Sequence, residues 1–401
     1  MNRFFPSRNK GLERLKGFAP HAGRDYARLR NYDLGPESHV HVSQLSPYLR
    51  HRLVTEKEVL QTVLNRHSRA AAEKFIHEVF WRSYWKGWLE LRPGVWGQYR
   101  AGLARALDRT KAESGLRQRW DDACNGETGI DAFDHWAKEL RETGYLHNHA
   151  RMWFASIWIH TLNLPWELGA DLFLRHLLDG DPASNTLGWR WVGGLQTIGK
   201  TYLARPDNIH KFTENRFNPK GLARDAHPLS SQGHPPRGEP PQTPPWNPAE
   251  RVGVLIHDDD LNLNPLFESD VYPLTFTRLV TCDARSPLAV SEDVRRFAKG
   301  AMEDTVARWG ARLGTDAGEH ETPEAIAAWA KTNQLDQVVT PYGSTGPARD
   351  VLDDLDSRLT PQGISLIRVI NPYDSMTWPN ATHGFFRFKD HIGEFLDDLG
   401  L

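Results

Sequence analysis

The first half of the chain repeats apolar residues at intervals of three and four. Between Thr55 and Leu91, side chains such as Val59, Val63 and Phe75 follow this spacing, which predicts one or two amphipathic helices. The same spacing predicts three further helical segments, at residues 128–140, 151–164 and 169–180. No convincing alternating strand pattern precedes residue 250, so we expect this half to be mainly α-helical.

The pattern changes after a proline-rich stretch. Residues 219–248 contain nine prolines with clustered glycine, serine and glutamine, which predicts a linker that is partly extended. Beyond it, short apolar runs alternate with helical segments, and Ser291 followed by acidic residues marks one helix start. The predicted strands are 252–256, 336–342 and 364–370, and the predicted helices are 291–313, 323–334 and 348–363. This alternation predicts an α/β domain with a largely parallel sheet.

Length and charge support a division into domains. A chain of 401 residues exceeds the roughly 250–300 residues at which single cores stop growing. The net charge of −2 is the sum of two unlike parts: 34 Lys and Arg against 24 Asp and Glu in residues 1–224, and 15 against 27 in the rest. We therefore expect a helical domain at 1–224, a linker at 225–250 and an α/β domain at 251–401.

Composition excludes several classes of protein. No run approaches the roughly 20 apolar residues of a membrane helix, and the first residues lack the apolar core of a secretory signal, so we expect a cytoplasmic protein. Two cysteines, Cys124 and Cys282, are too few for a disulfide scaffold or a four-thiolate iron–sulfur cluster. Eleven of the fifteen tryptophans lie between Trp81 and Trp191, which suits either an aromatic helical core or stacking on a flat ligand.

Two polar patches come early in the chain. Tyr26, Ser43 and Ser46 precede a helical run, where hydroxyls and free N–H groups can bind phosphate, although serine is also an ordinary helix cap. The run IHEVFWRSYW then places a carboxylate, an arginine and two indoles on one helix face: Glu78, Trp81, Arg82 and Trp85. This second set suits a planar ligand with polar edges, or an amphipathic helix with an ordinary Glu–Arg pair.

Two more patches follow. TGYLHNHARM groups His147, Asn148, His149 and Arg151, but the spacing of its histidines does not support a zinc site, and no metal is expected. LLDGDPASNTLGWRW combines acids, an amide and indoles: Asp179, Asp181, Asn185, Trp189 and Trp191. It lacks the order of an EF-hand and suits hydrogen bonding to the edges of a heterocycle, or a solvated turn between helices.

Taken in order, the four patches resemble the flavin domain of the DNA photolyase/cryptochrome family. The resemblance runs from FFPSRNKGLERL near the N-terminus to about Phe217. It implies an all-helical FAD-binding domain of photolyase type, followed here by a smaller Rossmann-like α/β domain. The implied cofactor is FAD, with its phosphates at Tyr26, Ser43 and Ser46. Its ring would be addressed by Arg151, Asp179, Asp181 and Asn185, with Asn185 near N5 of the ring, and Arg82 is a further cofactor-binding residue.

The resemblance also implies a substrate pocket. Family members that repair cyclobutane pyrimidine dimers hold the flipped-out dimer with five side chains, whose counterparts here are Glu78, Trp81, Asn148, Met152 and Trp191. The implied activity is that of a deoxyribodipyrimidine photolyase, a lyase driven by blue light through reduced FAD. The implied partner is damaged DNA, single- or double-stranded, bound by a monomer through the positive half of the chain.

Two alternatives remain open. One is a cryptochrome-like blue-light photoreceptor that binds FAD without repair and signals through a partner. The other is a flavoprotein of this fold that has lost its light function and serves as a binding or structural module.

Several positions depart from the family pattern. Val42 replaces a usual threonine, His149 replaces a usual arginine, and GGLQTIGKTYLARPDN replaces the family's run after Trp191. An electron relay is partly matched, with Trp189 as the member next to the flavin and Trp166 as the middle one. Its distal position falls near Glu113, which leaves Trp120 as a candidate.

The order of the domains is the largest departure, since the family places an α/β antenna domain before the flavin domain. VGVLIHDDDLNLNPL resembles the start of that antenna domain, and GISLIRVINPYDSMTWPNATHGFFRFKDHI resembles its end. We therefore predict a circular permutation, with an unrelated α/β domain as the alternative. The residues assign no antenna chromophore. The negative half is expected to face away from DNA.

Overall fold

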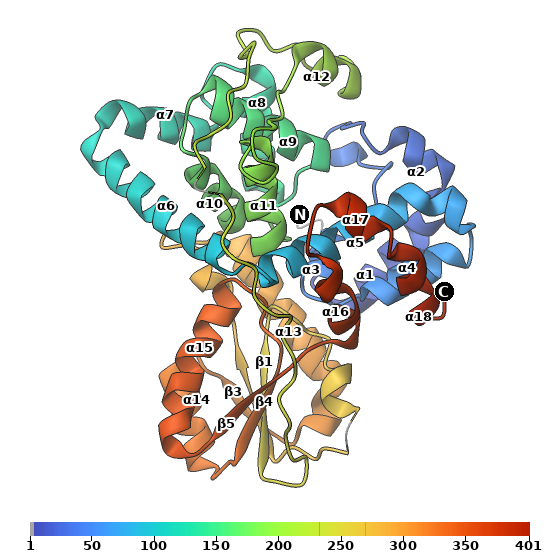
Figure 1. Cartoon of the computed structure of the whole chain (residues 1–401), viewed down its shortest axis with the longest axis vertical. Helices are drawn as coiled ribbons and strands as arrows, with labels where there is room; N and C mark the ends of the chain where they lie inside the picture. The colour runs from blue at the N-terminus through green and yellow to red at the C-terminus, as the bar shows by residue number, and fades with distance from the viewer. Residues whose placement is uncertain (1–3, 232, 269) are drawn as a thin grey trace.

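Helices make up the first half of the chain (Figure 1). The computed structural model describes residues 4–231, 233–268 and 270–401. The helices of this half are α1 (Arg8–Phe18), α2 (Arg24–Leu29), α3 (Ser46–Arg50), α4 (Glu56–Leu64), α5 (Arg69–Glu90), α6 (Gly94–Ala112), α7 (Ser114–Asn125), α8 (Asp131–Thr143), α9 (Asn148–Ser156), α10 (Trp166–His176), α11 (Pro182–Val192) and α12 (Pro206–Phe212). The predicted helical character is confirmed, and none of the helices in the described part of the chain is long and apolar enough to cross a membrane.

The second half contains a parallel sheet whose strand order is β3-β2-β1-β4-β5. Its strands are β1 (Val252–His257), β2 (Thr275–Leu279), β3 (Thr315–Glu319), β4 (Gln337–Pro341) and β5 (Ser365–Val369). The predicted strands and the parallel α/β pattern are confirmed, whereas β2 and β3 were not predicted. β3 is an edge strand that exposes four of its five residues, so it carries no hydrophobic pattern to detect.

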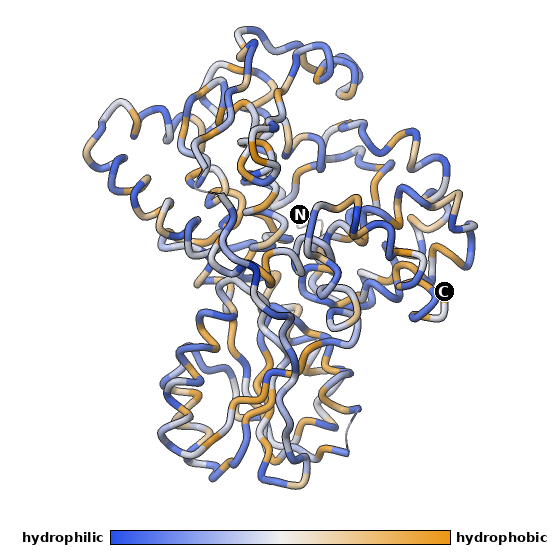
Figure 2. The backbone as a smooth tube through the Cα atoms, viewed as in Figure 1, coloured by the Kyte–Doolittle hydropathy of each residue, from blue (hydrophilic) through white to orange (hydrophobic). Residues whose placement is uncertain are grey.

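Helices cover both faces of this sheet: α13 (Glu292–Leu313), α14 (Pro323–Thr332) and α15 (Pro347–Leu359). Leu255 packs in one cluster with α14 and α15, whereas its neighbours Val254 and Ile256 belong to a second cluster with Phe297 of α13. All six residues of β1 are buried, as expected for a parallel strand between two helical layers. In Figure 2 the hydrophobic colour gathers in the middle of the α/β half.

The last residues of the chain return to the helical half. They form three short helices, α16 (Pro372–Thr377), α17 (Phe385–Lys389) and α18 (Ile392–Asp398), which lie near α5 in Figure 1. Tyr373 Oη lies 2.6 Å from Ser83 Oγ of α5. Gly87 permits a close approach, because a Cβ there would lie 2.8 Å from the Cα of Trp378. The C-terminal segment therefore packs on α5.

The proline-rich stretch crosses the molecule without forming a helix or strand in its described part, between Thr213 and Arg251. Figure 1 shows it passing from the helical half to the base of the sheet. The backbone N–H of Leu229 donates to the carbonyl of Gly193 at 2.9 Å, and that of Gly238 donates to Leu91 at 2.8 Å. The segment is thus attached to the helices along its course.

An acidic loop after β1 joins the two halves. Asp259 lies 2.8 Å from Arg50, and Asp260 lies 2.6 Å from Arg52, with all four side chains buried. The loop lies at the carboxyl ends of the strands, where the chain order reverses between β1 and β4. These acidic side chains therefore face arginines of the helical half.

Candidate functional site

Helix α5 presents the predicted Glu–Trp–Arg–Trp set on its central turns. Ser68 caps the helix by accepting a hydrogen bond from the N–H of Ala71 at 3.2 Å, which satisfies a free amide at the helix start. Glu78 forms an ion pair with Arg30, whose guanidinium lies 5.9 Å from the ring centroid of Tyr26. Two predicted residues, Tyr26 and Glu78, are thus connected through Arg30.

Arg82 connects α5 to the start of α11. Its guanidinium lies 2.9 Å from Asp181 and 3.5 Å from Glu56. Asp181 also caps α11 by accepting a hydrogen bond from the N–H of Ser184 at 2.8 Å. Burial raises the pKa of the Asp181 carboxyl, but the charges of Arg82, Lys86 and Arg50 outweigh it and hold that pKa below its usual value. Asp181 is therefore an ionised acceptor inside the helical half.

A second ion pair connects α9 to the loop before α11. Arg151 lies 2.8 Å from Asp179 and also donates to the carbonyl of Leu146 at 3.0 Å. The carboxylate of Asp179 is almost completely buried, and its second oxygen, Oδ1, has no hydrogen-bond partner in the described part of the chain. A buried carboxylate oxygen of this kind requires a donor, which the described residues do not supply.

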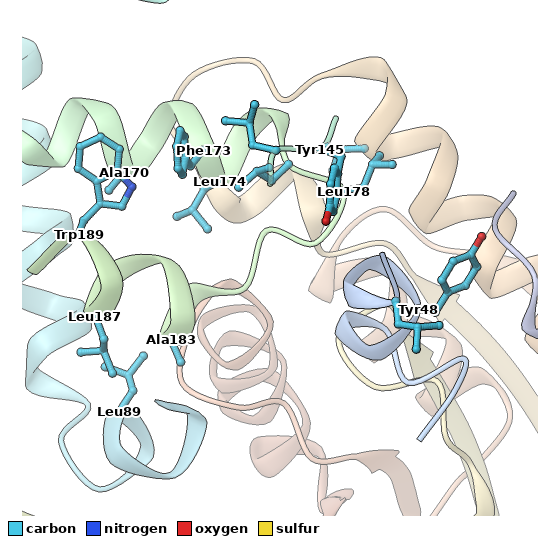
Figure 3. Close-up of a cluster of buried hydrophobic side chains, with 14 of the residues drawn as sticks. Tyr48, Leu89, Tyr145, Ala170, Phe173, Leu174, Leu178, Ala183, Leu187 and Trp189 are labelled. Atoms are coloured by element: carbon cyan, nitrogen blue, oxygen red, sulfur yellow. The ribbon is translucent and has the colours of Figure 1, made fainter. Parts of the chain in front are cut away.

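Asn185 lies on the first turns of α11, and its amide donates to the carbonyl of Ala170 at 2.8 Å. Helix α11 packs against both α5 and α9. Figure 3 shows part of the apolar packing around it, with Leu187 near Leu89 and Trp189 near Phe173. The structure thus brings together α5, α9, α11 and the loop before α11. These elements carry Arg82, Arg151, Asp179, Asp181 and Asn185.

The predicted phosphate-binding serines lie in a separate turn. Ser46 begins the five-residue helix α3, and Ser43 Oγ accepts a hydrogen bond from the N–H of Leu45 at 3.3 Å. Between them, Gln44 has a positive φ of 50° and is buried. Both serines remain half-buried, and no described hydrogen bond connects them to Tyr26.

The five residues predicted to contact a dimer come from three neighbouring helices. Asn148 is exposed at the start of α9, and Met152 is half-buried one turn later. Trp191 of α11 stacks on Tyr202 at 5.4 Å, and Trp81 of α5 stacks on another ring, that of Phe385. Because α11 packs on both α5 and α9, these helices lie together, although no described ring contact joins the two indoles.

The histidines of the third patch have structural partners. His147 caps α9, accepting a hydrogen bond from the N–H of His149 at 3.2 Å, and its ring stacks on His39. Burial, followed by the nearby His39 and His149, lowers the pKa of His147 to about 3. His149 stacks on Trp153 at 4.1 Å. Across the described residues, no three His, Cys, Asp or Glu side chains are grouped so that they could hold a metal ion.

The predicted relay tryptophans have separate ring neighbours. Trp189 is buried among aromatic rings, including that of Trp158 at 6.0 Å, whereas Trp166 lies 5.7 Å from Tyr99. Gly169 of α10 makes the first arrangement possible, because a Cβ there would lie 2.2 Å from the indole of Trp189. Trp158 is thus the described indole neighbour of Trp189. The distal candidate, Trp120, is buried and carries Arg117 over its ring.

Sequence reasoning missed several residues of this site: Arg30, Trp158, Tyr202 and Phe385. Arg30 follows Tyr26 by four residues, but nothing in the local sequence shows that its partner is 48 positions away. Phe385 lies in the quoted C-terminal run and is separated from α5 by the whole α/β half. Only the folded chain reveals these partners.

The residues around α11 fit a flavin ring. Asp179 Oδ1 is a buried acceptor without a hydrogen-bond partner among the described residues, and Arg82 Nε, whose contact is the ion pair with Glu56 at 3.5 Å, is a buried donor that makes no hydrogen bond there. A heterocycle with N–H and C=O edges satisfies groups of both kinds. Trp189 adds a buried, unpartnered indole N–H on the same helix.

Comparison with known proteins finds matches to the helical half of the chain, which carries this candidate site. Residues 75–222 match the FAD binding domain of DNA photolyase. A deoxyribodipyrimidine photo-lyase of Streptomyces griseus is 33% identical over 194 residues, which are 45% of this chain and 41% of that protein. A cryptochrome DASH of Idiomarina loihiensis is 32% identical over 157 residues, 39% of this chain and 33% of that protein.

A solved structure also matches. The crystal structure of a bacterial class III photolyase from Agrobacterium tumefaciens is 26% identical, with a TM-score of 0.43, over 52% of this chain and 43% of that one. The chain thus matches less than half the length of each of these three relatives. The similarity to the FAD binding domain of DNA photolyase thus covers residues 75–222, in the helical half of the chain.

Proposed function

We propose that this chain binds FAD in the helical half and repairs cyclobutane pyrimidine dimers in DNA with blue light. The observation that carries the cofactor assignment is two ion pairs with buried aspartates, Arg82–Asp181 and Arg151–Asp179, with an oxygen on Asp179 that has no hydrogen-bond partner among the described residues. Asn185 would add an amide beside them. Tyr26, Ser43 and Ser46 would hold the phosphates.

Bound FAD in its reduced form would supply blue-light electron-transfer chemistry to the dimer. The protein would orient the two partners. Arg82 and Arg151 would place positive charge beside the cofactor, and the charge of Arg82 helps to keep the pKa of Asp181 below its usual value.

The substrate pocket would use α5, α9 and α11. Glu78 would accept hydrogen bonds from the polar edge of an extruded pyrimidine, since its carboxylate is held in an ion pair by Arg30. Asn148, exposed at the start of α9, would bind a second edge. The indoles of Trp81 and Trp191 would provide flat apolar walls, with Met152 beside them. The balance of +10 in residues 1–224, from 34 basic and 24 acidic residues, would favour the DNA backbone.

A blue-light photoreceptor is the second candidate. The match to a cryptochrome DASH favours it. So does His149, which occupies a position where the family usually has an arginine and which stacks on Trp153. In that case the chain would bind FAD and respond to light without splitting dimers.

The two candidates differ in one experiment. FAD-loaded, chemically reduced protein is mixed with single-stranded DNA that carries one thymine dimer and is illuminated with blue light. Repair predicts loss of the dimer and a lower yield with Glu78→Ala. A protein that holds FAD but leaves the dimer intact would support photoreception. A protein that cannot be loaded with flavin would contradict both.

A further inference from the structure

Helix α17 is fixed to α5 beside the proposed dimer pocket. Its first residue, Phe385, is buried against Trp81, with ring centroids 3.7 Å apart and planes at 11°. Just before the helix, the carbonyl of His383 accepts a hydrogen bond from the hydroxyl of Tyr84 at 2.9 Å. Phe388 of α17 contacts Phe80 of α5, with ring centroids 6.5 Å apart. Residues next to Phe385 are therefore held in place near Trp81.

The next residue, Phe386, is exposed to solvent, unlike Phe385. Phe386 is 79% exposed, although it follows the buried Phe385 directly. An apolar ring held by a short, anchored helix is ready for stacking, because few of its degrees of freedom remain to be lost on binding. In proteins that bind single-stranded nucleic acid, exposed aromatic rings of this kind stack on bases of any sequence.

Two basic side chains, Arg387 and Lys389, follow this ring in α17. Arg387 is exposed and Lys389 half-buried, and neither forms an ion pair with a carboxylate in the described part of the chain. Two further cations of this side of the molecule, Lys74 and Arg30, act on His77 of α5 together with Lys389, but they are paired with Glu73 and Glu78. Lysine and arginine side chains without carboxylate partners are suited to phosphates.

We propose that α17 extends the DNA-binding surface of α5: Phe386 stacks on an unpaired base beside the dimer, while Arg387 and Lys389 contact the strand's phosphates. The proposal rests on the proposed function in its choice of partner. The combination of an exposed ring with free cations favours nucleic acid over a protein groove, which would cover the ring and leave the cations without partners.

Binding of labelled single-stranded oligonucleotides, with and without one thymine dimer, tests this in the dark by fluorescence anisotropy. The FAD-loaded full chain is used. Phe386→Ala should weaken binding about tenfold. The double variant Arg387→Ala/Lys389→Ala should reduce the slope of log affinity against log salt by about 0.7 for each phosphate that it no longer neutralises. Circular dichroism before and after substitution checks that the fold is kept.

Two matched substitutions serve as controls. Phe5→Ala removes another exposed ring, 62% accessible, and Lys331→Ala removes an exposed cation at the end of α14. Both should bind like the unsubstituted protein.

The outcomes separate this proposal from repair. If the chain binds DNA through α17 but leaves dimers intact under blue light, repair is wrong and the docking surface stands. If the chain splits dimers while Phe386→Ala and the double variant bind like the unsubstituted protein, the docking surface is wrong and repair stands. If the unsubstituted chain binds neither oligonucleotide at low salt, the docking surface is also overturned.

Discussion

The indole of Trp81 and the ring of Phe385 lie face to face, 3.7 Å between centroids, although the two residues are separated by the entire α/β half of the chain. This stack connects the proposed substrate pocket to the C-terminal segment. Through this stack, the segment that follows β5 packs against α5.

Phe385→Ala should therefore destabilise the protein. Phe385 is only 6% exposed, and loss of a buried phenylalanine costs about 3–5 kcal/mol of unfolding free energy. Urea unfolding measures this loss. Phe386→Ala, one residue later and largely exposed, should change the unfolding free energy by no more than about 0.5 kcal/mol. Equal losses in the two variants would contradict the stack's role.

Flavin content should depend on Asn185. Replacement of Asn185 by alanine removes the amide that donates to the carbonyl of Ala170 without leaving a charge unpaired, so the fold should persist while bound flavin decreases. Absorbance of the purified protein, compared with its circular dichroism, measures both. Asn148→Ala, at an exposed position outside the proposed cofactor set, is the control and should keep its flavin. Full flavin in Asn185→Ala would show that its amide is not needed.

Acid should destabilise the fold through buried histidines. The pKa of His147 is lowered to about 3 by burial and that of His51 to about 4, whereas both titrate near 6.5 when unfolded. Because the unfolded chain then binds more protons, stability is complete above pH 6.5 and falls as the pH drops toward 4. Each histidine should contribute about 1.4 kcal/mol per pH unit below 6.5.

His147→Asn separates this contribution from the rest. Asparagine keeps a helix cap at the start of α9 but does not titrate. Unfolding free energies measured at pH 7 and pH 5 should therefore differ less in the variant than in the unsubstituted protein. An unchanged difference would assign the acid sensitivity to other groups.

The contact between the two halves should depend on Arg52. This buried arginine lies 2.6 Å from Asp260, 2.5 Å from Asp374 and 3.3 Å from Glu56. Arg52→Met leaves three carboxylates without their shared cation, so we expect a loss of about 3–5 kcal/mol in the free energy of unfolding. Arg66→Met, at an exposed position, should have little effect. A loss below about 1 kcal/mol would show that the pairs are not needed.

The sequence allowed prediction of much of the fold, because the periodic patterns are local. The Ser291 cap is present, with the N–H of Asp293 donating to its hydroxyl at 3.2 Å. The edge strand β3 was missed because its residues are exposed and polar. The three helices that follow Asn371, α16 to α18, were missed because they are short and their apolar faces depend on α5.

The candidate site was also predicted only in part: its residues were found from local runs, but their ionic partners were not. Local patches indicated Glu78, Asp179 and Asp181, since each lies in a distinctive run of residues. Their ionic partners could not be read from those runs: Arg82 is 99 positions from Asp181, and Arg30 is 48 from Glu78. Such pairs follow from helix packing, which single-sequence patterns do not specify.

Loss of thymine dimers under blue light tests the central claim most directly. The reduced, FAD-loaded chain is incubated with dimer-containing single-stranded DNA, in light and in the dark, beside Glu78→Gln, which keeps the size of the side chain but removes its charge. The account predicts dimer loss only in the light, with a clearly lower yield for Glu78→Gln. Intact dimers after illumination of fully reduced, flavin-loaded protein would contradict it.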